Sequence, residues 1–367
     1  MDTPDHDGWM LYGATGYTGV LLAEEAKRRG LRPLLAGRSE SKLKPLAERL
    51  GMPFRAVGLD DPKALRDSLT GVRAVLHVAG PFVDTSEPMV RACLDVKAHY
   101  LDLTGERSVF HQVLNTDAEA RARGVCLISG VGFDVVPSDC LAKHVADRVS
   151  GGAHALEIAL VMVGRPSAGT AKSLVGFIHE GTWVRRGGVL QRVPFGRGVR
   201  KVRFPQRESW TMPMNLADLE TAYRTTGAPD ITVRLAIPSS LAGTLRAAWP
   251  LFAAGAWATR PLFASTRIQR ALRDWVDAHV QGADEARRAR TRTFAWARAH
   301  GASGDETQAW LECPDAYDFT AHSALNATLA LLERASPGAI TPALAFGADF
   351  PLTVPGVRRL DTLPDQP

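Results

Sequence analysis

The sequence predicts an α/β protein whose first domain is a doubly wound parallel sheet and whose second domain is α+β, built on a mainly antiparallel sheet. Three observations predict this fold class: a glycine-rich turn within the first twenty residues, short apolar runs alternating with helical patterns up to residue 129, and longer strands from residue 154 onward. With 367 residues, 45% of them hydrophobic, the chain is long enough for two domains with sizeable cores.

The N-terminal part alternates strands and helices as in a parallel sheet with helices on both faces. Expected strands cover residues 9–12, 33–36, 54–57, 74–78, 100–103 and 125–129, and expected helices cover 20–26, 40–50, 62–69, 88–97 and 109–122. Ligands of such sheets bind beyond the carboxyl ends of the strands. The loops 80–82, 104–106 and 130–134 are therefore expected around one crevice, together with the glycine turn.

The second half of the chain changes to longer strands. Residues 156–163 alternate in part, residues 231–237 alternate clearly, and the runs 292–299 and 307–313 flank a Gly-Ala-Ser-Gly turn, as in a β-hairpin. An amphipathic helix over 319–334 precedes a tail rich in Pro and Gly. The predicted domains are residues 1–140, residues 141–318, and a C-terminal helix and tail over 319–367 that pack back on the first domain.

The glycine-rich turn predicts a dinucleotide-binding site of the Rossmann type. Its glycines are spaced three residues apart between an apolar strand and a helical run, so that a pyrophosphate can approach the backbone amides at the helix N-terminus. The expected cofactor-binding residues of the turn are Gly13, Ala14, Thr15, Gly16, Tyr17, Thr18 and Gly19. For the bare motif, a turn without a ligand is the alternative.

The end of the second strand predicts which dinucleotide is bound. An NAD site usually carries an acidic residue here for the ribose 2′-hydroxyl, but this sequence has Gly37, Arg38 and Ser39. A guanidinium and a hydroxyl suit the 2′-phosphate of NADP(H), so Arg38 and Ser39 are expected to select that cofactor. The alternative is that Arg38 is a solvated loop arginine.

Several blocks of the sequence together resemble the saccharopine dehydrogenase-like oxidoreductases, and more narrowly the branch that includes trans-acting enoyl reductases. The blocks are residues 13–19 (G-A-T-G-Y-T-G), 36–38 (A-G-R), 79–82 (A-G-P-F), 100–106 (Y-L-D-L-T-G-E), 132–139 (G-F-D-V-V-P-S-D), 167–170, 218–238 and 341–350. The resemblance covers nearly the whole chain and implies a nicotinamide cofactor and a hydride step. The loop of Ala79, Gly80, Pro81 and Phe82 is expected to contact the cofactor as well.

Four residues near the expected crevice are candidates for the catalytic group: Tyr100, Asp102, Glu106 and Asp134. Hydride transfer to an enoyl or imine carbon needs a proton donor and no nucleophile. Asp134 is preferred because saccharopine-reducing members of the family have an active-site Asp in a G-x-D-P-G motif, and Asp134 falls at the similar place. Val135 replaces the Pro of that motif, which argues against an amino-acid substrate. The alternative for Glu106 and Asp134 is that each caps a neighbouring helix.

These residues predict an NADP(H)-dependent oxidoreductase that reduces an enoyl intermediate of lipid or polyketide synthesis, on a small-molecule or carrier-bound acyl substrate. Two alternatives remain: reduction of an imine formed from an amine and a carbonyl compound, and a redox sensor that binds NADP(H) without turnover. No tyrosine is followed by a lysine four residues later, so the mechanism of short-chain reductases is not expected.

Charge and cysteine patterns weigh against other functions. Residues 151–300 contain 22 Lys and Arg against 10 Asp and Glu, a balance of +12 within a chain of net charge +5. No nucleic-acid motif accompanies this basic region, so no nucleic-acid partner is expected. The four cysteines lack a C-x-x-C pair, so neither a metal site nor a disulfide framework is expected. The first eight residues contain no apolar segment, and a cytoplasmic location is expected.

The segment 235–280 is unusual for such a chain. Residues 247–258 carry no charge but are too few to span a bilayer, and arginines and tryptophans are interleaved around them. This pattern favours a membrane surface, an acyl chain or the interface of a homodimer. Of these, peripheral contact with a membrane or a lipid-like substrate is expected, and a buried helix pair is the alternative.

Overall fold

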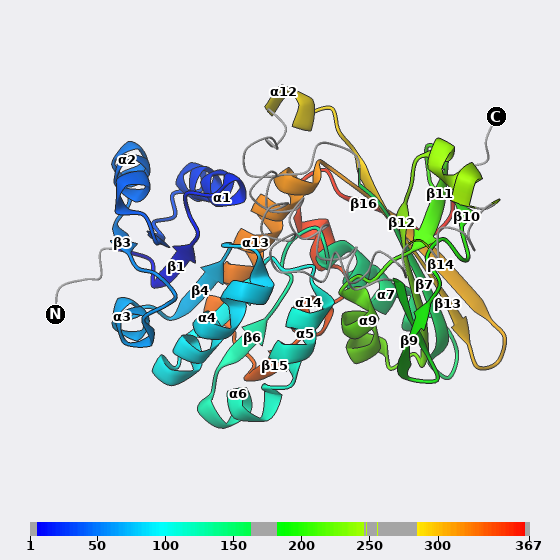
Figure 1. The fold of residues 1–367 in the computed structure, drawn as a ribbon, viewed down its shortest axis with the longest axis horizontal. Helices are drawn as coiled ribbons and strands as arrows, with labels where there is room; N and C mark the ends of the chain where they lie inside the picture. The colour runs from blue at the N-terminus through cyan, green and yellow to red at the C-terminus, as the bar shows by residue number, and fades with distance from the viewer. Residues whose placement is uncertain (1–5, 163–181, 246, 248–254, 256–284, 364–367) are drawn as a thin grey trace. The chain divides into compact units, whose positions relative to one another are not determined.

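The computed structural model describes residues 6–162, 182–245, 247, 255 and 285–363 (Figure 1). Contacts divide the chain into two compact units. Unit 1 comprises residues 1–136 and 317–355, and unit 2 comprises residues 137–316 and 356–367. Each unit is built on its own β-sheet.

Unit 1 contains a seven-stranded parallel sheet in the order β15-β6-β5-β4-β1-β2-β3, which confirms the predicted doubly wound sheet. The strands are β1 (Trp9–Tyr12), β2 (Leu34–Gly37), β3 (Phe54–Ala56), β4 (Ala74–His77), β5 (His99–Asp102), β6 (Cys126–Ile128) and β15 (Gly338–Ile340). The chain order reverses between β1 and β4. In sheets of this kind, ligands bind beyond the carboxyl ends of the strands at this reversal.

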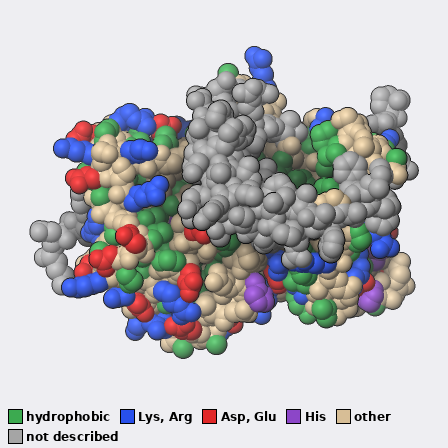
Figure 2. All heavy atoms as spheres, in the orientation of Figure 1, with side chains coloured by type: hydrophobic (Ala, Val, Ile, Leu, Met, Phe, Trp, Pro, Cys, Tyr) green, Lys and Arg blue, Asp and Glu red, His purple; other side chains and the backbone are tan. Residues whose placement is uncertain are grey.

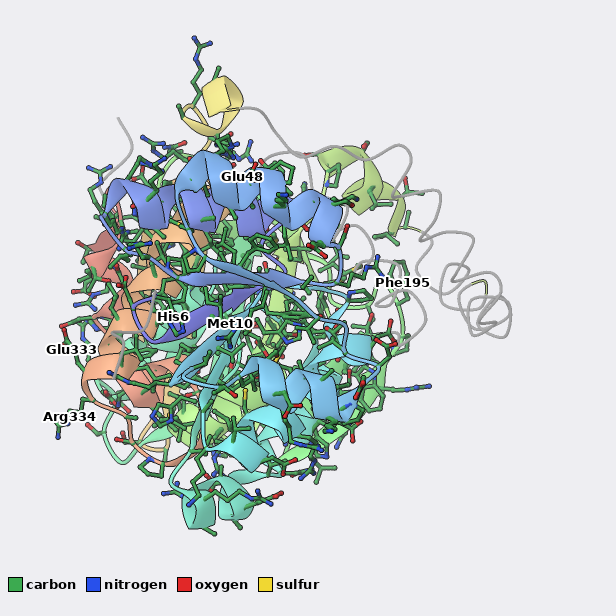
Figure 3. The ribbon with its side chains drawn as sticks, turned by 90° about the vertical axis from the view of Figure 1, so that its left-hand side faces the viewer. His6, Met10, Glu48, Phe195, Glu333 and Arg334 are labelled. Atoms are coloured by element: carbon green, nitrogen blue, oxygen red, sulfur yellow. The ribbon has the colours of Figure 1, made fainter. Side chains whose placement is uncertain are left out.

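Helices cover both faces of this sheet. They are α1 (Tyr17–Arg28), α2 (Glu40–Leu50), α3 (Pro62–Ser68), α4 (Phe82–Val96), α5 (Arg107–Leu114), α6 (Asp117–Arg123), α13 (Ala316–Glu333), α14 (Pro342–Phe346) and the 3-10 turn η1 (Phe350–Thr353). Figure 3 shows Met10 in the central sheet and Glu48, on α2, in the layer at one side of it. Arg29 follows α1 and donates to the Asn326 side chain of α13 at 2.7 Å, so α13 packs beside α1.

The strands of unit 1 are apolar along their length because helices cover the sheet on both faces. Trp9, Met10 and Leu11 of β1 have no exposed surface, and the next strands along the sheet are buried in the same way. Charged side chains lie on the outside, where Lys and Arg are interspersed with Asp and Glu (Figure 2). The pair of Arg91 and Glu119, 2.6 Å apart, is one example.

Two helices of unit 1 differ from the expected ones. Helix α4 begins at Phe82, whereas the sequence predicted that it begins at Pro88. That prediction agrees with the preference of proline for the first turn of a helix. Pro88 instead lies inside α4. The helix expected over 109–122 is divided into α5 and α6, which are separated by Asn115 and Thr116.

Unit 2 contains a nine-stranded mixed sheet with the main path β10-β11-β12-β7-β13-β14-β16, which β8 and β9 join at β12. The strands are β7 (Ala153–Val161), β8 (Thr182–Arg186), β9 (Val189–Val193), β10 (Arg200–Arg203), β11 (Glu208–Pro213), β12 (Asp230–Ala236), β13 (Thr293–Gly301), β14 (Glu306–Cys313) and β16 (Arg358–Leu360). Helices α7 (Val136–Ala146), α9 (Asp218–Thr226) and α12 (Glu285–Arg288) belong to the same part of the chain.

The second sheet is mainly antiparallel, as predicted, but β7 and β12 run parallel. A half-buried strand alternates in the same way in either direction, so its pattern does not reveal the direction of its neighbour. The tail differs as well. Strand β16 pairs with β14, so the chain from residue 356 belongs to unit 2, whereas residues 317–355 belong to unit 1.

The unusual segment 235–280 lies mostly outside the described residues, so its expected contact with a membrane, an acyl chain or a second subunit stays a prediction. Among the helices that the structure describes, none combines the length and the apolar character needed to cross a bilayer. Cys93, Cys126, Cys140 and Cys313 are all buried free thiols.

Candidate functional site

The glycine turn joins β1 to α1 at the reversal of strand order. Gly13 has a φ of +90°, and a Cβ atom there would lie 2.8 Å from the nitrogen of Ala79. A Cβ atom at Gly19 would lie 2.2 Å from the oxygen of Gly13. The amides of Gly13 and Ala14 both donate to the carbonyl of Ala36, at 2.8 and 3.1 Å. The first and third glycines are therefore required by packing inside the protein.

Gly16 differs from the other two glycines because the protein leaves its surroundings open. It is exposed, it is the N-cap of α1, and among the described atoms a Cβ there would meet only the oxygen of Gly13, at 3.4 Å. No side chain caps this helix. The open space and the helix N-terminus fit a pyrophosphate, which the helix dipole and backbone amides stabilise. Thr15, Tyr17 and Thr18 are partly exposed around it.

The carboxyl end of β2 offers a cation and no acid. Arg38 is exposed, and within the described part of the chain its guanidinium has no hydrogen-bond or ion-pair partner. The Ser39 hydroxyl lies next to it in the chain, 3.1 Å from the hydroxyl of Ser41. Burial raises the pKa of Tyr12, at the end of β1, to about 12, and the positive charge of Arg38 opposes that rise. An unpaired guanidinium at this edge fits the 2′-phosphate of NADP(H).

The loop after β4, residues 79–82, is held in place by His77 and Thr85, which the sequence did not predict as site residues. His77 is fully buried, and its Nε2 lies 3.2 Å from the carbonyl oxygen of Ala79. Burial lowers the pKa of His77 to about 4, so the ring is neutral at pH 7. The Thr85 hydroxyl donates to the carbonyls of Ala79 and Pro81, at 2.6 and 3.1 Å. In the sequence, the position of His77 at the end of an apolar strand was the one sign that this residue belongs to the site.

The carboxylate of Asp102 connects the loops that follow β5 and β6. It accepts hydrogen bonds from the Tyr100 hydroxyl at 2.9 Å, the Thr104 amide at 3.0 Å, the Ser129 hydroxyl at 2.9 Å and the Gly130 amide at 2.8 Å. Asp102 and Tyr100 have no exposed surface, and burial raises the pKa of both. All these hydrogen bonds of Asp102 are made to groups of the protein itself. The geometry therefore favours a role for Asp102 and Tyr100 in positioning the loops after β5 and β6.

Glu106 connects the loop after β5 to the start of α4. Its Oε2 accepts the amide of Val83, in the first turn of α4, at 2.8 Å, and its own amide donates to the Thr104 hydroxyl at 3.1 Å. Glu106 precedes α5, but its side chain does not cap that helix. The Glu106 carboxylate therefore binds the first turn of α4 and not that of α5, and this contact fixes the end of the 79–82 loop.

Asp134 has a different environment from the other candidates. It is partly buried against Gly105, where an added Cβ atom would lie 3.1 Å from the Asp134 Cβ. Within the described residues its carboxyl group has no hydrogen-bond or ion-pair partner, so it does not cap the following helix. Burial raises the pKa of Asp134 to about 6. A partly buried carboxyl group with this pKa is suited to proton transfer near neutral pH.

The structure brings the predicted loops of unit 1 together at the carboxyl edge of its sheet. Gly13 meets Ala79, Val83 binds Glu106, and Gly105 lies against Asp134. The Asp102 carboxylate joins the loops after β5 and β6. Among the described residues, His, Cys, Asp and Glu side chains form no group of three or more that could hold a metal ion.

Comparisons with known proteins identify unit 1. Residues 9–128 match the family model of the saccharopine dehydrogenase NADP binding domain, so NADP(H) is the cofactor of this domain. A saccharopine dehydrogenase-like oxidoreductase from Homo sapiens is 28% identical over 194 residues, which cover 47% of this chain and 44% of that protein. A trans-acting enoyl reductase from Mycobacterium ulcerans is 30% identical over 149 residues, which cover 38% of this chain and 36% of that protein. The matched segments thus span less than half of these two relatives.

The fold of the chain is shared with a solved structure over almost its full length. The apo histidine-tagged saccharopine dehydrogenase (L-Glu forming) from Saccharomyces cerevisiae superposes with a TM-score of 0.64, covering 96% of this chain and 99% of that chain. The two sequences are 10% identical. This similarity establishes a common fold for both units.

Proposed function

We propose that the chain is an oxidoreductase of the saccharopine dehydrogenase-like family, whose NADP-binding domain residues 9–128 match, and that it uses NADPH to reduce the C=C bond of an enoyl acyl substrate, with Asp134 as the proton donor. The observation that carries this proposal is the Asp134 carboxyl group. It lies at the edge of the NADP-binding unit, lacks a partner among the described residues, and has a pKa raised to about 6.

Five of the predicted residues then have the following proposed roles. Bound NADPH supplies the hydride to one carbon of the double bond. The backbone around Gly16 holds the pyrophosphate, and Arg38 and Ser39 hold the 2′-phosphate. Glu106 fixes the loop beside the glycine turn through the amide of Val83. Asp134 gives its proton to the second carbon, so the double bond becomes a single bond, and the carboxylate that remains is reprotonated from water.

The enoyl substrate is supported by the mycobacterial relative and by the sequence around Asp134. In the G-x-D-P-G motif of the saccharopine-reducing members, the position of the Pro is taken by Val135 in this chain, so an amino-acid substrate is disfavoured. Reduction of an imine is the competing reaction within the same family. A third candidate, a sensor that binds NADP(H) without turnover, is disfavoured by the unpartnered acid that Asp134 provides.

Oxidation of NADPH separates these functions. The protein is mixed with NADPH and an enoyl thioester, with NADPH and an amine plus a 2-oxo acid, or with NADPH alone, and the absorbance of NADPH is followed. We expect consumption with the enoyl thioester. Consumption only with the amine and the 2-oxo acid would assign an imine reductase. NADPH binding without consumption in every mixture would assign a sensor.

Arg38 is expected to determine the choice of cofactor. A charge-assisted hydrogen bond to a phosphate contributes about 1.5 to 3 kcal/mol, or about one to two orders of magnitude in affinity. NADPH should therefore bind more tightly than NADH by that factor, and Arg38→Asp should remove the difference. Fluorescence titration measures both affinities. Lys44→Asp, an equal change of charge at an exposed site of α2, should preserve the preference. Equal affinities in the unmodified protein would refute the assignment.

A further inference from the structure

Unit 2 contains a pocket of about 740 Å³ that is lined by arginines. Its lining residues are Gln206, Arg207, Ala286, Arg290, Thr291, Arg292 and Phe294. They come from the turn between β10 and β11, from α12, from the segment before β13, and from β13 itself. A pocket of this volume is within the range of sites for small molecules.

The charge inside the pocket is not balanced by the residues that line it. Among the lining residues that the structure describes, three are arginines, all of them exposed, and none is Asp or Glu. The guanidinium groups of Arg207 and Arg290 have no hydrogen-bond or ion-pair partner in the described part of the chain. Among the described residues, Arg292 donates only to backbone carbonyls, of Thr291 at 3.0 Å and of Ala289 at 3.5 Å. Three cations around one concavity repel one another and attract an anion.

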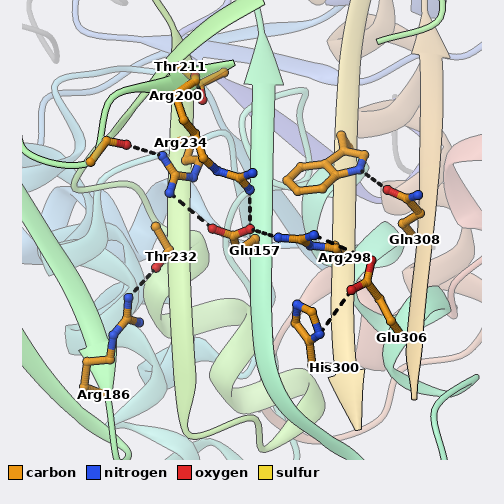
Figure 4. Close-up of polar contacts among 12 residues, drawn as sticks. Glu157, Arg186, Arg200, Thr211, Thr232, Arg234, Arg298, His300, Glu306 and Gln308 are labelled. Atoms are coloured by element: carbon orange, nitrogen blue, oxygen red, sulfur yellow. Dashed lines mark hydrogen bonds and ion pairs between the residues drawn. The ribbon is translucent and has the colours of Figure 1, made fainter. Parts of the chain in front are cut away.

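In the same sheet, three arginines with a structural role are paired with one carboxylate. Glu157, on β7, binds Arg200 of β10, Arg234 of β12 at 3.2 Å and Arg298 of β13 at 2.7 Å (Figure 4). Burial acts to raise the pKa of Glu157, but the three guanidiniums outweigh it and lower the pKa overall. Where arginines converge inside the sheet, the chain thus supplies a carboxylate. At the pocket, no described lining residue is a carboxylate.

One wall of the pocket is the apolar side chain of Phe294. Phe294 is 4% exposed and packs against Phe204, with ring centroids 6.3 Å apart. Both rings belong to a buried cluster that also contains Trp296 and Trp310. The arginines therefore surround a fixed surface, and a ligand there can place its anionic group on the guanidiniums and its organic part beside Phe294.

We propose that this pocket binds the phosphate group of a phosphorylated small molecule. Guanidinium groups bind phosphate oxygens through two parallel hydrogen bonds, and a phosphate monoester carries nearly two negative charges at pH 7. One dianion would neutralise most of the charge of Arg207, Arg290 and Arg292. This site is separate from the NADP(H) site, which lies in unit 1. A phosphorylated carrier of the acyl substrate and a free phosphorylated metabolite are two sources of the same chemical group.

Calorimetric titration of the full chain tests the proposal. The protein is first saturated with NADP⁺, so that phosphate cannot report on the cofactor site. It is then titrated with inorganic phosphate, with 4′-phosphopantetheine and with adenosine 3′-phosphate. We expect saturable binding of at least one phosphate compound that weakens as salt increases. The compound that binds most tightly identifies the source of the group. No binding of any of the three at concentrations up to about 10 mM would overturn the proposal.

Two double variants with the same change of net charge separate the pocket from the general charge of unit 2. Arg207→Ser/Arg290→Ser removes the two unpartnered guanidiniums and should weaken phosphate binding about 10- to 100-fold. Arg192→Ser/Lys201→Ser removes two cations outside the pocket, which lie over Trp183 and Trp210. This control should change binding less than about threefold. Equal weakening in both variants would show that the pocket contributes nothing specific. An unchanged far-UV circular dichroism spectrum and an unchanged unfolding transition show that both variants are folded.

Discussion

Asp134→Asn is expected to lower the turnover number about 10²- to 10⁴-fold while leaving the affinity for NADPH unchanged. The substitution keeps the size of the side chain and removes its titrating proton, so only the step that needs an acid is slowed. Steady-state rates with an enoyl thioester and fluorescence titration with NADPH measure the two quantities. Asp102→Asn is not a suitable control, because four hydrogen bonds depend on that carboxylate. Asp84→Asn, at an exposed carboxylate of α4, should be close to neutral.

The pH dependence of the rate provides a second readout of the same group. The pKa of Asp134 is about 6, so the acid form, which donates the proton, is lost as the pH rises through 6. For reduction, kcat/KM should therefore fall above this pH in the unmodified protein. Asp134→Asn should show no such decrease. A rate that is flat between pH 5 and 8 in the unmodified protein would contradict the assignment.

The stability of Asp134→Asn should change in the opposite direction to its activity. Burial raises the pKa of Asp134 in the folded protein, so the folded state binds the proton more tightly than the unfolded state. This stabilisation is complete below about pH 4 and is lost as the pH rises through 6. At pH 7 the Asn variant should be more stable by about 1 to 3 kcal/mol, and below pH 4 that difference should vanish. Unfolding in denaturant measures it. A variant that is less stable at pH 7 and loses tenfold activity or less would return Asp134 to a structural role.

Gly16→Val is expected to weaken NADPH binding roughly 100-fold without unfolding the protein, which corresponds to about 2.7 kcal/mol. A branched side chain fits the described part of the protein at this position, because only the oxygen of Gly13 lies within 4 Å of the added Cβ there. It would occupy the space that the pyrophosphate needs. Fluorescence enhancement of NADPH measures binding, and the far-UV circular dichroism spectrum reports the fold.

Two other glycines are matched controls for this experiment. Gly243→Val adds the same side chain at an open position of unit 2 and should leave binding unchanged. Gly19→Ala should instead disturb folding, because a Cβ atom there would lie 2.2 Å from the oxygen of Gly13. If Gly16→Val binds NADPH with normal affinity, the turn is a structural feature alone.

The sequence predicted most of unit 1 because burial leaves a clear pattern there. Its strands are continuous apolar runs, and its helices have one apolar face. The strands between residues 182 and 213 were not predicted, and in two of them, β9 and β10, few side chains are buried. Strand β9 has no buried residue, and Val202 is the buried residue of β10. An exposed strand of arginines and glutamines has no alternation of apolar and polar residues from which it could be recognised.

For the site, the sequence predicted which loops meet but not what each carboxylate does. The order of strands placed Gly13, Ala79 and Asp134 at one edge, since parallel strands end on the same side. Asp102, Glu106 and Asp134 look alike in the sequence, as acids near strand ends. They differ in the hydrogen-bond donors that surround them: Asp102 accepts two amides and two hydroxyls, Glu106 accepts the amide of Val83, and Asp134 accepts none from the described residues. Backbone amides carry no signature in the residue types.

The Asp102 carboxylate has a consequence for amide hydrogen exchange. The amides of Thr104 and Gly130 lie in loops, where exchange usually needs only a small local opening. Both donate to this fully buried carboxylate, so releasing either one would leave the acid short of a partner in an apolar environment. These two amides should therefore exchange together and about as slowly as those of Leu101 and Leu127 in the neighbouring strands. The two loops beside Asp134 would then open only when this edge of the sheet opens, which holds the proposed acid in place between turnovers.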